Sequence, residues 1–225
     1  RSMADFFSEY GIMLLTETGA TLAMTLISTL VAYVVGIPVG VLVTITNEHS
    51  VLPCRPVNIV LGWIVNMGRS IPFIILLVAL MPFTRMIVGS AVGVRGVIVP
   101  LSIAAIPFVA RMIETALAEI DGGLIEVAHA TGSTTWQIIW KVLLPESIPS
   151  ILMGVPITLI TLVGYSAMAG TVGGGGLGDV ALRYGYYRYQ TEVMIATIII
   201  LIILVQIMQS LGSFIARKSD KRIRK

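Results

Sequence analysis

The sequence predicts an all-α membrane protein with about five transmembrane helices. Of its 225 residues, 56% are hydrophobic and only 12% are charged, whereas a soluble domain carries about twice that share of charge. The mean hydropathy of +0.94 favours the same class. Several uncharged runs are long enough to cross a bilayer, which takes about 20 helical residues. The single cysteine, Cys54, excludes an internal disulfide and a cage of thiolate metal ligands.

The uncharged runs place the expected spans in order along the chain. Residues 18–47 carry no charge and predict a first span at about 20–44. A second span lies between two arginines, and Arg69 interrupts it. The remaining spans are bounded in the same way, so that the second to fifth are expected at about 57–80, 93–112, 150–169 and 193–216. An odd number of spans puts the two termini on opposite sides of the membrane.

Lysine and arginine gather at the C-terminal end and predict the orientation of the spans. Cytoplasmic loops carry an excess of these residues, and the tail 217–225 holds six of them. We therefore expect a cytoplasmic tail, an extracytoplasmic segment at 1–17 and a cytoplasmic segment at 114–146. Because the basic residues flank apolar runs, they indicate membrane orientation rather than nucleic-acid binding. The first two residues, Arg1 and Ser2, are interpreted as a cloning remnant.

The cytoplasmic segment carries signals for two short helices. Asp121, followed by two glycines, can cap a helix at about 124–130, and Gly132 can end it in the left-handed conformation. Thr134, with a glutamine three residues later, predicts a capping box that starts a second helix. We expect Pro145 to end that helix, because proline lacks the N–H that continues it. Two short helices joined at a glycine predict a compact knob that can transmit force.

Two tryptophans lie four residues apart on the second helix, so they share one face. We expect Trp136 and Trp140 to pack on the protein's own spans. A surface that contacts a partner protein is the alternative.

The sequence contains fragments of cofactor and metal motifs, but the flanking elements that these motifs require are missing. Gly173, Gly175 and Gly178 spell G-x-G-x-x-G, but this fingerprint needs a preceding strand, and here a membrane span precedes it. The run is interpreted as a flexible hinge on the outer face, where bare backbone packs closely. Glu126 and His129 have the spacing of half a di-iron site, but no second copy exists. With no Walker A motif either, we expect no catalytic residue, no metal site and no cofactor.

Arg69 is the unusual residue of the predicted spans. A guanidinium inside a bilayer costs at least about 2.5 kcal/mol unless it meets water or a partner. One hypothesis places Arg69 on a transport pathway or subunit interface, where it handles a carboxylate. The other is that Pro72 breaks the second span and leaves Arg69 in a wet crevice, bound to backbone carbonyls.

The segment E-V-A-H-A-T-G, followed after nine residues by V-L-L-P, resembles the EAA loop of ABC importer permeases. Val127 and Val142 depart mildly from the family pattern. Three further stretches, at 69–77, 107–111 and 158–168, are similar to methionine-importer permeases, and the resemblance covers about 18–218. The positions that match the EAA pattern are Glu126, Ala128, Gly132, Leu144 and Pro145.

The resemblance implies a type I ABC importer transmembrane domain at 18–216, with five spans, the N-terminus outside and the C-terminus in the cytoplasm. It implies a homodimer in the bacterial inner membrane that imports L- and D-methionine. It also implies two separate ATPase subunits, which bind the ATP and dock on the EAA loop, and a methionine-binding lipoprotein outside. The chain itself is then not an enzyme. A permease for another amino acid or small solute is the first alternative, and a membrane channel or enzyme is the second.

The fourth span has the composition of a pathway-lining helix, because it combines polar residues, small residues and two prolines. Tyr165, Ser166 and Met168 lie near its outer end, just before the glycine run. Methionine is flexible and polarizable, which suits a gate that two subunits form and part. The alternative for Met168 is ordinary packing between helices. With only Arg69 charged at mid-membrane, specificity is expected to reside in the binding protein.

Overall fold

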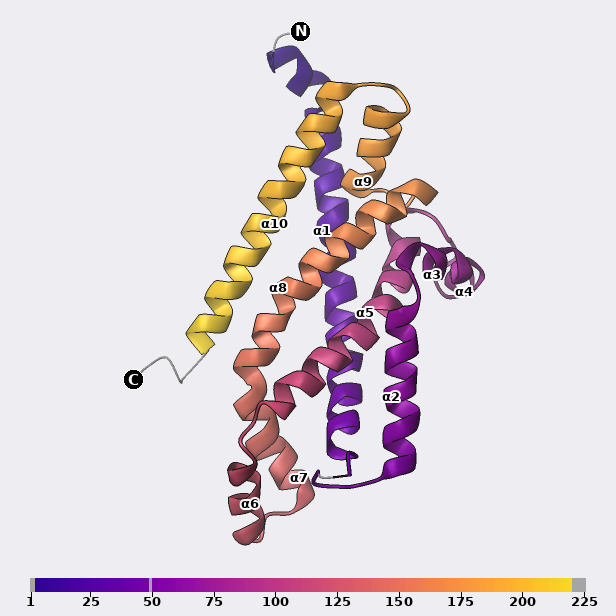
Figure 1. Cartoon of the computed structure of the whole chain (residues 1–225). Helices are drawn as coiled ribbons and strands as arrows, with labels where there is room; N and C mark the ends of the chain where they lie inside the picture. The colour runs from indigo at the N-terminus through magenta and orange to yellow at the C-terminus, as the bar shows by residue number, and fades with distance from the viewer. Residues whose placement is uncertain (1–2, 49, 220–225) are drawn as a thin grey trace.

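Helices form the regular structure of the chain in the computed structural model, which describes residues 3–48 and 50–219 (Figure 1). Arg1, Ser2, His49 and the end of the basic tail lie outside the described residues. In chain order the helices are α1 (Met3–Ile45), α2 (Arg55–Ser70), α3 (Phe73–Ala79), α4 (Met81–Val88), α5 (Gly93–Ala118), α6 (Gly122–Ala130), α7 (Thr135–Ile138), α8 (Leu144–Ala169), α9 (Gly176–Val180) and α10 (Thr191–Ser219). Two π-helical turns, Ile139–Leu143 and Ala181–Tyr186, and a 3₁₀ turn, Gly170–Val172, connect some of them.

The described residues contain four helical segments that are long and apolar enough to cross a membrane. They are α1, α5, the stretch Thr135–Val172 and α10, and the bent pair of α2 and α3 makes a fifth if it is counted as one span. The prediction of a multi-pass, all-α membrane protein is therefore confirmed. The first span is longer than expected, because α1 begins at Met3 and includes most of the segment 1–17.

The second span is broken rather than continuous. The helix α2 ends at Ser70, and α3 leaves at an angle of 101°. The break lies at Ile71, whose extended backbone (φ −83°, ψ 122°) is the conformation that a following proline favours. The hypothesis that Pro72 breaks the second span is therefore confirmed, and Arg69 lies in the last turn of α2, just before the break.

Among the described residues, the helices α1 and α5 share the most extensive helix–helix contact, and glycine on α1 removes the side chains between them. A Cβ built on Gly36 would lie 2.7 Å from the Val109 side chain, and one on Gly40 would lie 2.6 Å from the Ala110 carbonyl oxygen. Small residues allow such approach between membrane helices. Val109 is fully buried here and belongs to the main hydrophobic core.

The glycine run after α8 is also packed against backbone. A Cβ on Gly178 would lie 2.3 Å from the Ala167 Cα atom. On the other side, the Glu17 carboxylate accepts a 2.6 Å hydrogen bond from the Gly176 N–H, and the Thr21 hydroxyl oxygen accepts one of 2.9 Å from the Leu177 N–H. The run therefore joins α1 to the C-terminal end of α8, with the close backbone packing that the sequence predicts.

The α1–α5 contact predicts that two glycine-to-alanine substitutions on α1 change the stability of the protein in opposite directions. Gly40→Ala should destabilise the protein by about 1–3 kcal/mol, because its new methyl group meets the α5 backbone. Gly19→Ala, also on α1 but with nothing within 4 Å of its Cβ position, should stabilise it by up to about 1 kcal/mol through helix propensity. Thermal unfolding midpoints of the detergent-purified variants measure both. Midpoints that move in the same direction would contradict the contact.

Candidate functional site

The segment between α5 and α8 forms a knob at one end of the bundle (Figure 1). Its first helix, α6, is capped by Asp121, whose carboxylate accepts a 2.8 Å hydrogen bond from the Gly123 N–H. The turn after α6 contains Gly132 at φ +79°, and the Ser133 N–H bonds to the Ala128 carbonyl over 3.0 Å. Both the cap and the left-handed glycine are confirmed.

The second helix of the knob starts as predicted but does not end as predicted. Thr134 and Gln137 form the capping box, with backbone-to-side-chain distances of 3.0 and 3.3 Å. Pro145 does not terminate the helix, because Thr135–Val172 is one continuous stretch of 38 residues. A π-helical turn accommodates the proline. The Leu144 N–H bonds to the carbonyl of Ile139, five residues earlier, and this wider turn relieves the clash between the proline ring and the preceding turn of the helix. The knob is therefore continuous with a membrane span.

The motif positions of the knob divide between an inner and an outer face. Ala128 is buried and packs in the main core together with residues of α5 and of the second helix, so its small size serves the docking of α6 on this chain. Leu144 is half-buried in the same cluster. Glu126, Gly132 and Pro145 are exposed. The outer face of α6 therefore presents Glu126 and its neighbours to whatever lies beyond the chain.

The tryptophan pair also points outward, which corrects the expectation that it packs on the protein's own spans. Trp136 is 67% exposed and Trp140 is 55% exposed, and their ring centroids lie 5.4 Å apart. The inward face of the same helix is taken by Ile138 and Ile139, which are buried in the core. The helix therefore shows a large aromatic surface on the side opposite to the chain's own core.

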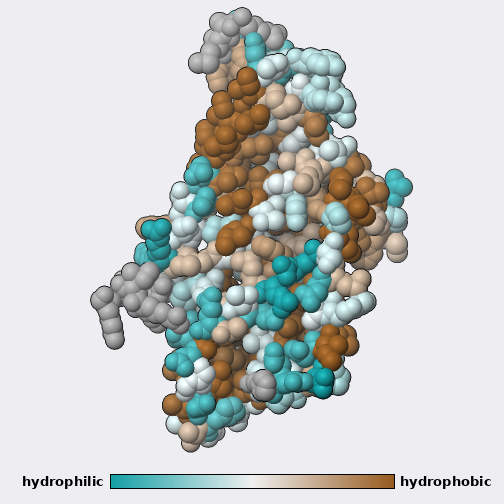
Figure 2. Space-filling model, in the orientation of Figure 1, coloured by the Kyte–Doolittle hydropathy of each residue, from teal (hydrophilic) through white to brown (hydrophobic). Residues whose placement is uncertain are grey.

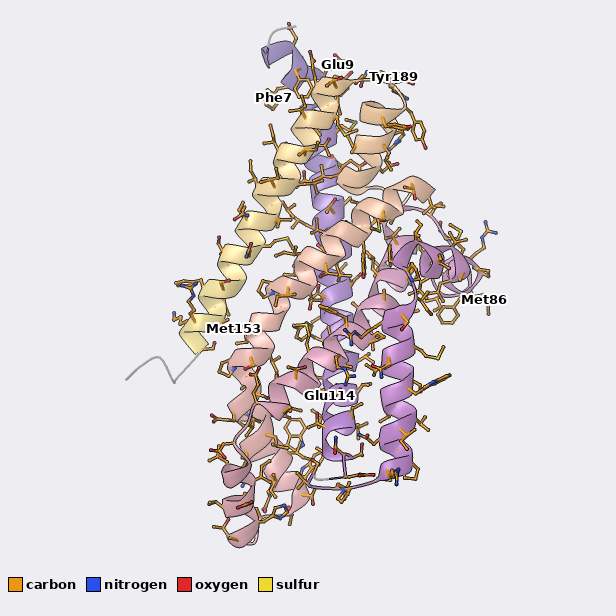
Figure 3. The ribbon with its side chains drawn as sticks, viewed as in Figure 1. Phe7, Glu9, Met86, Glu114, Met153 and Tyr189 are labelled. Atoms are coloured by element: carbon orange, nitrogen blue, oxygen red, sulfur yellow. The ribbon has the colours of Figure 1, made fainter. Side chains whose placement is uncertain are left out.

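A cleft of about 340 Å³ lies between α2, α5 and α8. Figure 3 shows Met153 on α8 and Glu114 on α5, at the level of the bundle where the cleft lies. In Figure 2, hydrophilic residues gather near the middle of the same face, over α5 and the adjoining part of α2. The cleft has both apolar and charged walls, lined by Arg69, Phe108, Arg111, Met112, Thr115, Ala116, Glu119, Ser150, Met153, Gly154 and Ile157.

The charges of the cleft are not all paired. Arg111 forms a 2.6 Å ion pair with Glu114 and donates a 3.1 Å hydrogen bond to Asn66. Glu119 accepts a 3.1 Å hydrogen bond from the Ser150 hydroxyl. Arg69 has no hydrogen bond or ion pair with any residue that the structure describes. It therefore stands in the cleft as a cation without a counterion, and no backbone carbonyl within the described chain holds it.

The predicted gate residues lie in different surroundings at the outer end of α8. Tyr165 stacks on Phe73 of α3 with parallel rings 4.6 Å apart. Ser166 is buried, and its hydroxyl donates a 2.8 Å hydrogen bond to the Val163 carbonyl of its own helix. Met168 is 49% exposed. Of the three, Met168 alone presents a large part of its side chain to a neighbour outside the chain.

The sequence alone did not identify Glu119, Ser150 and the methionines of the cleft as site residues. Glu119 and Ser150 are 31 positions apart and come together only when α5 packs beside α8. The pair of Arg111 and Glu114, three apart on one helix, carries a local signal that spacing could have shown.

Comparison with known proteins gives a family match and close relatives. Residues 36–225 match the family described as "Binding-protein-dependent transport system inner membrane component". The chain is 52% identical over 221 residues to a probable D-methionine transport system permease protein, MetI, of Vibrio cholerae, with 98% of each chain covered. It is 49% identical over 158 residues to the D-methionine transport system permease protein MetI of Escherichia coli K12, covering 70% of this chain and 73% of that one.

A solved structure shares the fold. A chain from the MetNI methionine ABC transporter, determined in inward-facing conformations, superposes with a TM-score of 0.93 at 47% identity. The match covers 95% of this chain and 99% of that one.

Proposed function

Because the chain belongs to the family of binding-protein-dependent transport system inner membrane components, we propose that it is the permease subunit of an ATP-driven methionine importer. Near full-length similarity to D-methionine permeases carries this proposal. The substrate is methionine, in its D form and also its L form. The chain supplies the membrane pathway and binds no cofactor, since its sequence has no Walker A motif and ATP hydrolysis belongs to a separate subunit.

The working assembly contains two copies of this chain and two ATPase subunits. Each knob docks on one ATPase, and the exposed residues Glu126 and Val127 on α6 lie on the contacting side. A substrate-binding lipoprotein delivers methionine at the opposite end of the bundle, beside the N-terminus. The knob then faces the cytoplasm, the bilayer is the bacterial inner membrane, and the membrane lipid covers the apolar outer faces of the spans.

Uptake by reconstituted vesicles tests the function. Vesicles that contain this chain, its ATPase and its binding protein should accumulate labelled methionine when ATP is present on the ATPase side. Uptake that persists without ATP would point to a channel and would contradict the importer. ATP-driven uptake of another amino acid, without methionine, would keep the importer but replace its substrate.

The turn of the knob generates a prediction about coupling. Gly132→Val should impose strain of about 1–2 kcal/mol, because Gly132 has φ +79°, which a β-branched residue tolerates poorly. We expect an assembled transporter that hydrolyses ATP but imports little methionine. Gly122→Val is the matched control, because Gly122 lies in the same knob with nothing within 4 Å of its Cβ position and no positive φ. Normal transport by Gly132→Val would show that the turn has no role in coupling.

The outer end of α8 generates a prediction about the gate. Transport by alternating access requires the spans to rock between inward-open and outward-open arrangements. We place Met168 at the outer closure, where the copies of α8 from the two subunits meet in the inward-open state. Tyr165 supports this closure by stacking on α3, and Ser166 supports it from within the helix.

Disulfide crosslinking tests the gate in a background where Cys54 is replaced by serine. Met168→Cys should crosslink the two subunits without nucleotide and should fail to do so in the ATP-bound state. Met153→Cys, on the same helix and similarly exposed, is the control and should not crosslink without nucleotide, because it lies toward the open end. If Met168→Cys crosslinks equally with and without nucleotide, or does not crosslink in either state, Met168 has only a packing role between helices.

A further inference from the structure

We propose that the cleft between α2, α5 and α8 holds the amino acid during transport, with Arg69 binding its carboxylate. The inference rests on the proposed function and adds a binding site within the membrane subunit to it. The cleft's volume of about 340 Å³ falls within the range of small-molecule sites, about 300–1,000 Å³.

The carboxylate goes to Arg69 because Arg69 is the unpaired cation of the cleft. The other arginine, Arg111, is already neutralised by Glu114 at 2.6 Å. The Arg69 side chain is exposed in the cleft, so its guanidinium is accessible to a ligand carboxylate. The planar guanidinium also offers two parallel N–H donors, which fit the two oxygens of a carboxylate.

The apolar wall of the cleft selects the side chain of the ligand. This wall consists of four apolar side chains: Phe108, Met112, Met153 and Ile157. Methionine side chains are flexible and polarizable, so they adapt to a ligand and contact a thioether favourably. The chemical class that fits is an α-amino acid with an unbranched apolar side chain.

Glu119 forms a second position nearer to the knob. Glu119 is the C-cap residue of α5 and follows Phe108 by eleven residues, which is about 16 Å along the helix. One amino acid therefore does not reach from one end of the cleft to the other. The Glu119 carboxylate, held by the Ser150 hydroxyl at 3.1 Å, attracts the ligand's ammonium group after the carboxylate leaves Arg69. The amino acid therefore meets one opposite charge at a time, which keeps binding weak enough for release.

Competition for labelled methionine tests the site in the assembled permease–ATPase complex, without nucleotide and without binding protein. Binding to the ATPase alone is measured in parallel and subtracted. Norleucine, which keeps the carboxylate and the unbranched side chain, should displace the label about as well as methionine. Methioninamide, which lacks the carboxylate, should be weaker by about tenfold or more, because it loses a hydrogen-bonded charge pair.

Arg69→Gln should bind methionine about tenfold more weakly and should no longer distinguish methionine from methioninamide. Arg69→Lys should keep part of the preference. Arg85→Gln is the matched control, because Arg85 is an exposed cation on α4 outside the cleft, and it should bind like the unaltered protein. Co-elution of permease and ATPase in size-exclusion chromatography shows that each complex has assembled. If Arg69→Gln does not assemble, the methioninamide comparison on the unaltered protein decides.

Three results would overturn the site: no saturable binding, equal displacement by methionine and methioninamide, or the same effect from Arg69→Gln and Arg85→Gln. ATP-driven methionine uptake by the unaltered transporter separates the two proposals. If uptake is normal and the cleft binds nothing, the site is wrong and the importer stands. If uptake itself is missing, the proposed function is wrong.

Discussion

The contact between α1 and α5 organises the bundle. Membrane helices gain little from hydrophobic burial against each other, because lipid is as apolar as their side chains, so their association depends on close packing. Gly36 and Gly40 provide that packing by letting α1 approach the α5 backbone. The other faces of α5 lie against α2 and α8, where they line the cleft, and its buried residues share the main core with the knob.

Sequence reasoning succeeded where the signal was local. Uncharged runs located the spans, and Asp121, Thr134 and Gly132 located the ends of the knob's helices, because caps and left-handed turns depend on few neighbours. The sequence predicted a helix break at both Pro72 and Pro145, but the structure shows a break only at Pro72. Pro72 breaks its span because the preceding residue becomes extended, whereas Pro145 is accommodated by a π-helical turn. That difference depends on packing around the turn, which the sequence does not display.

In the candidate site, too, the sequence identified the residues with a local signal and missed those that depend on tertiary contacts. Arg69 was found because a charge inside an apolar run is visible in any sequence. The direction of Ala128 and of the tryptophans was not visible, because helical spacing groups residues on one face without saying which face meets the core. The hydrogen bond from Ser150 to Glu119 joins two helices and exists only after α5 and α8 have packed. Contacts between distant segments are the part that spacing cannot supply.

The unbroken helix from Thr135 to Val172 acts as a lever arm. Its 38 residues follow a path of about 57 Å, which runs from the knob to the 3₁₀ turn that precedes α9 (Figure 1). If this arm tilts about its middle, each end moves through an arc proportional to half its length, so a tilt of about 10° displaces its two ends by about 5 Å in opposite directions. A single rotation of this helix then moves the knob and the end near α9 at the same time, without a chain of side-chain rearrangements between them.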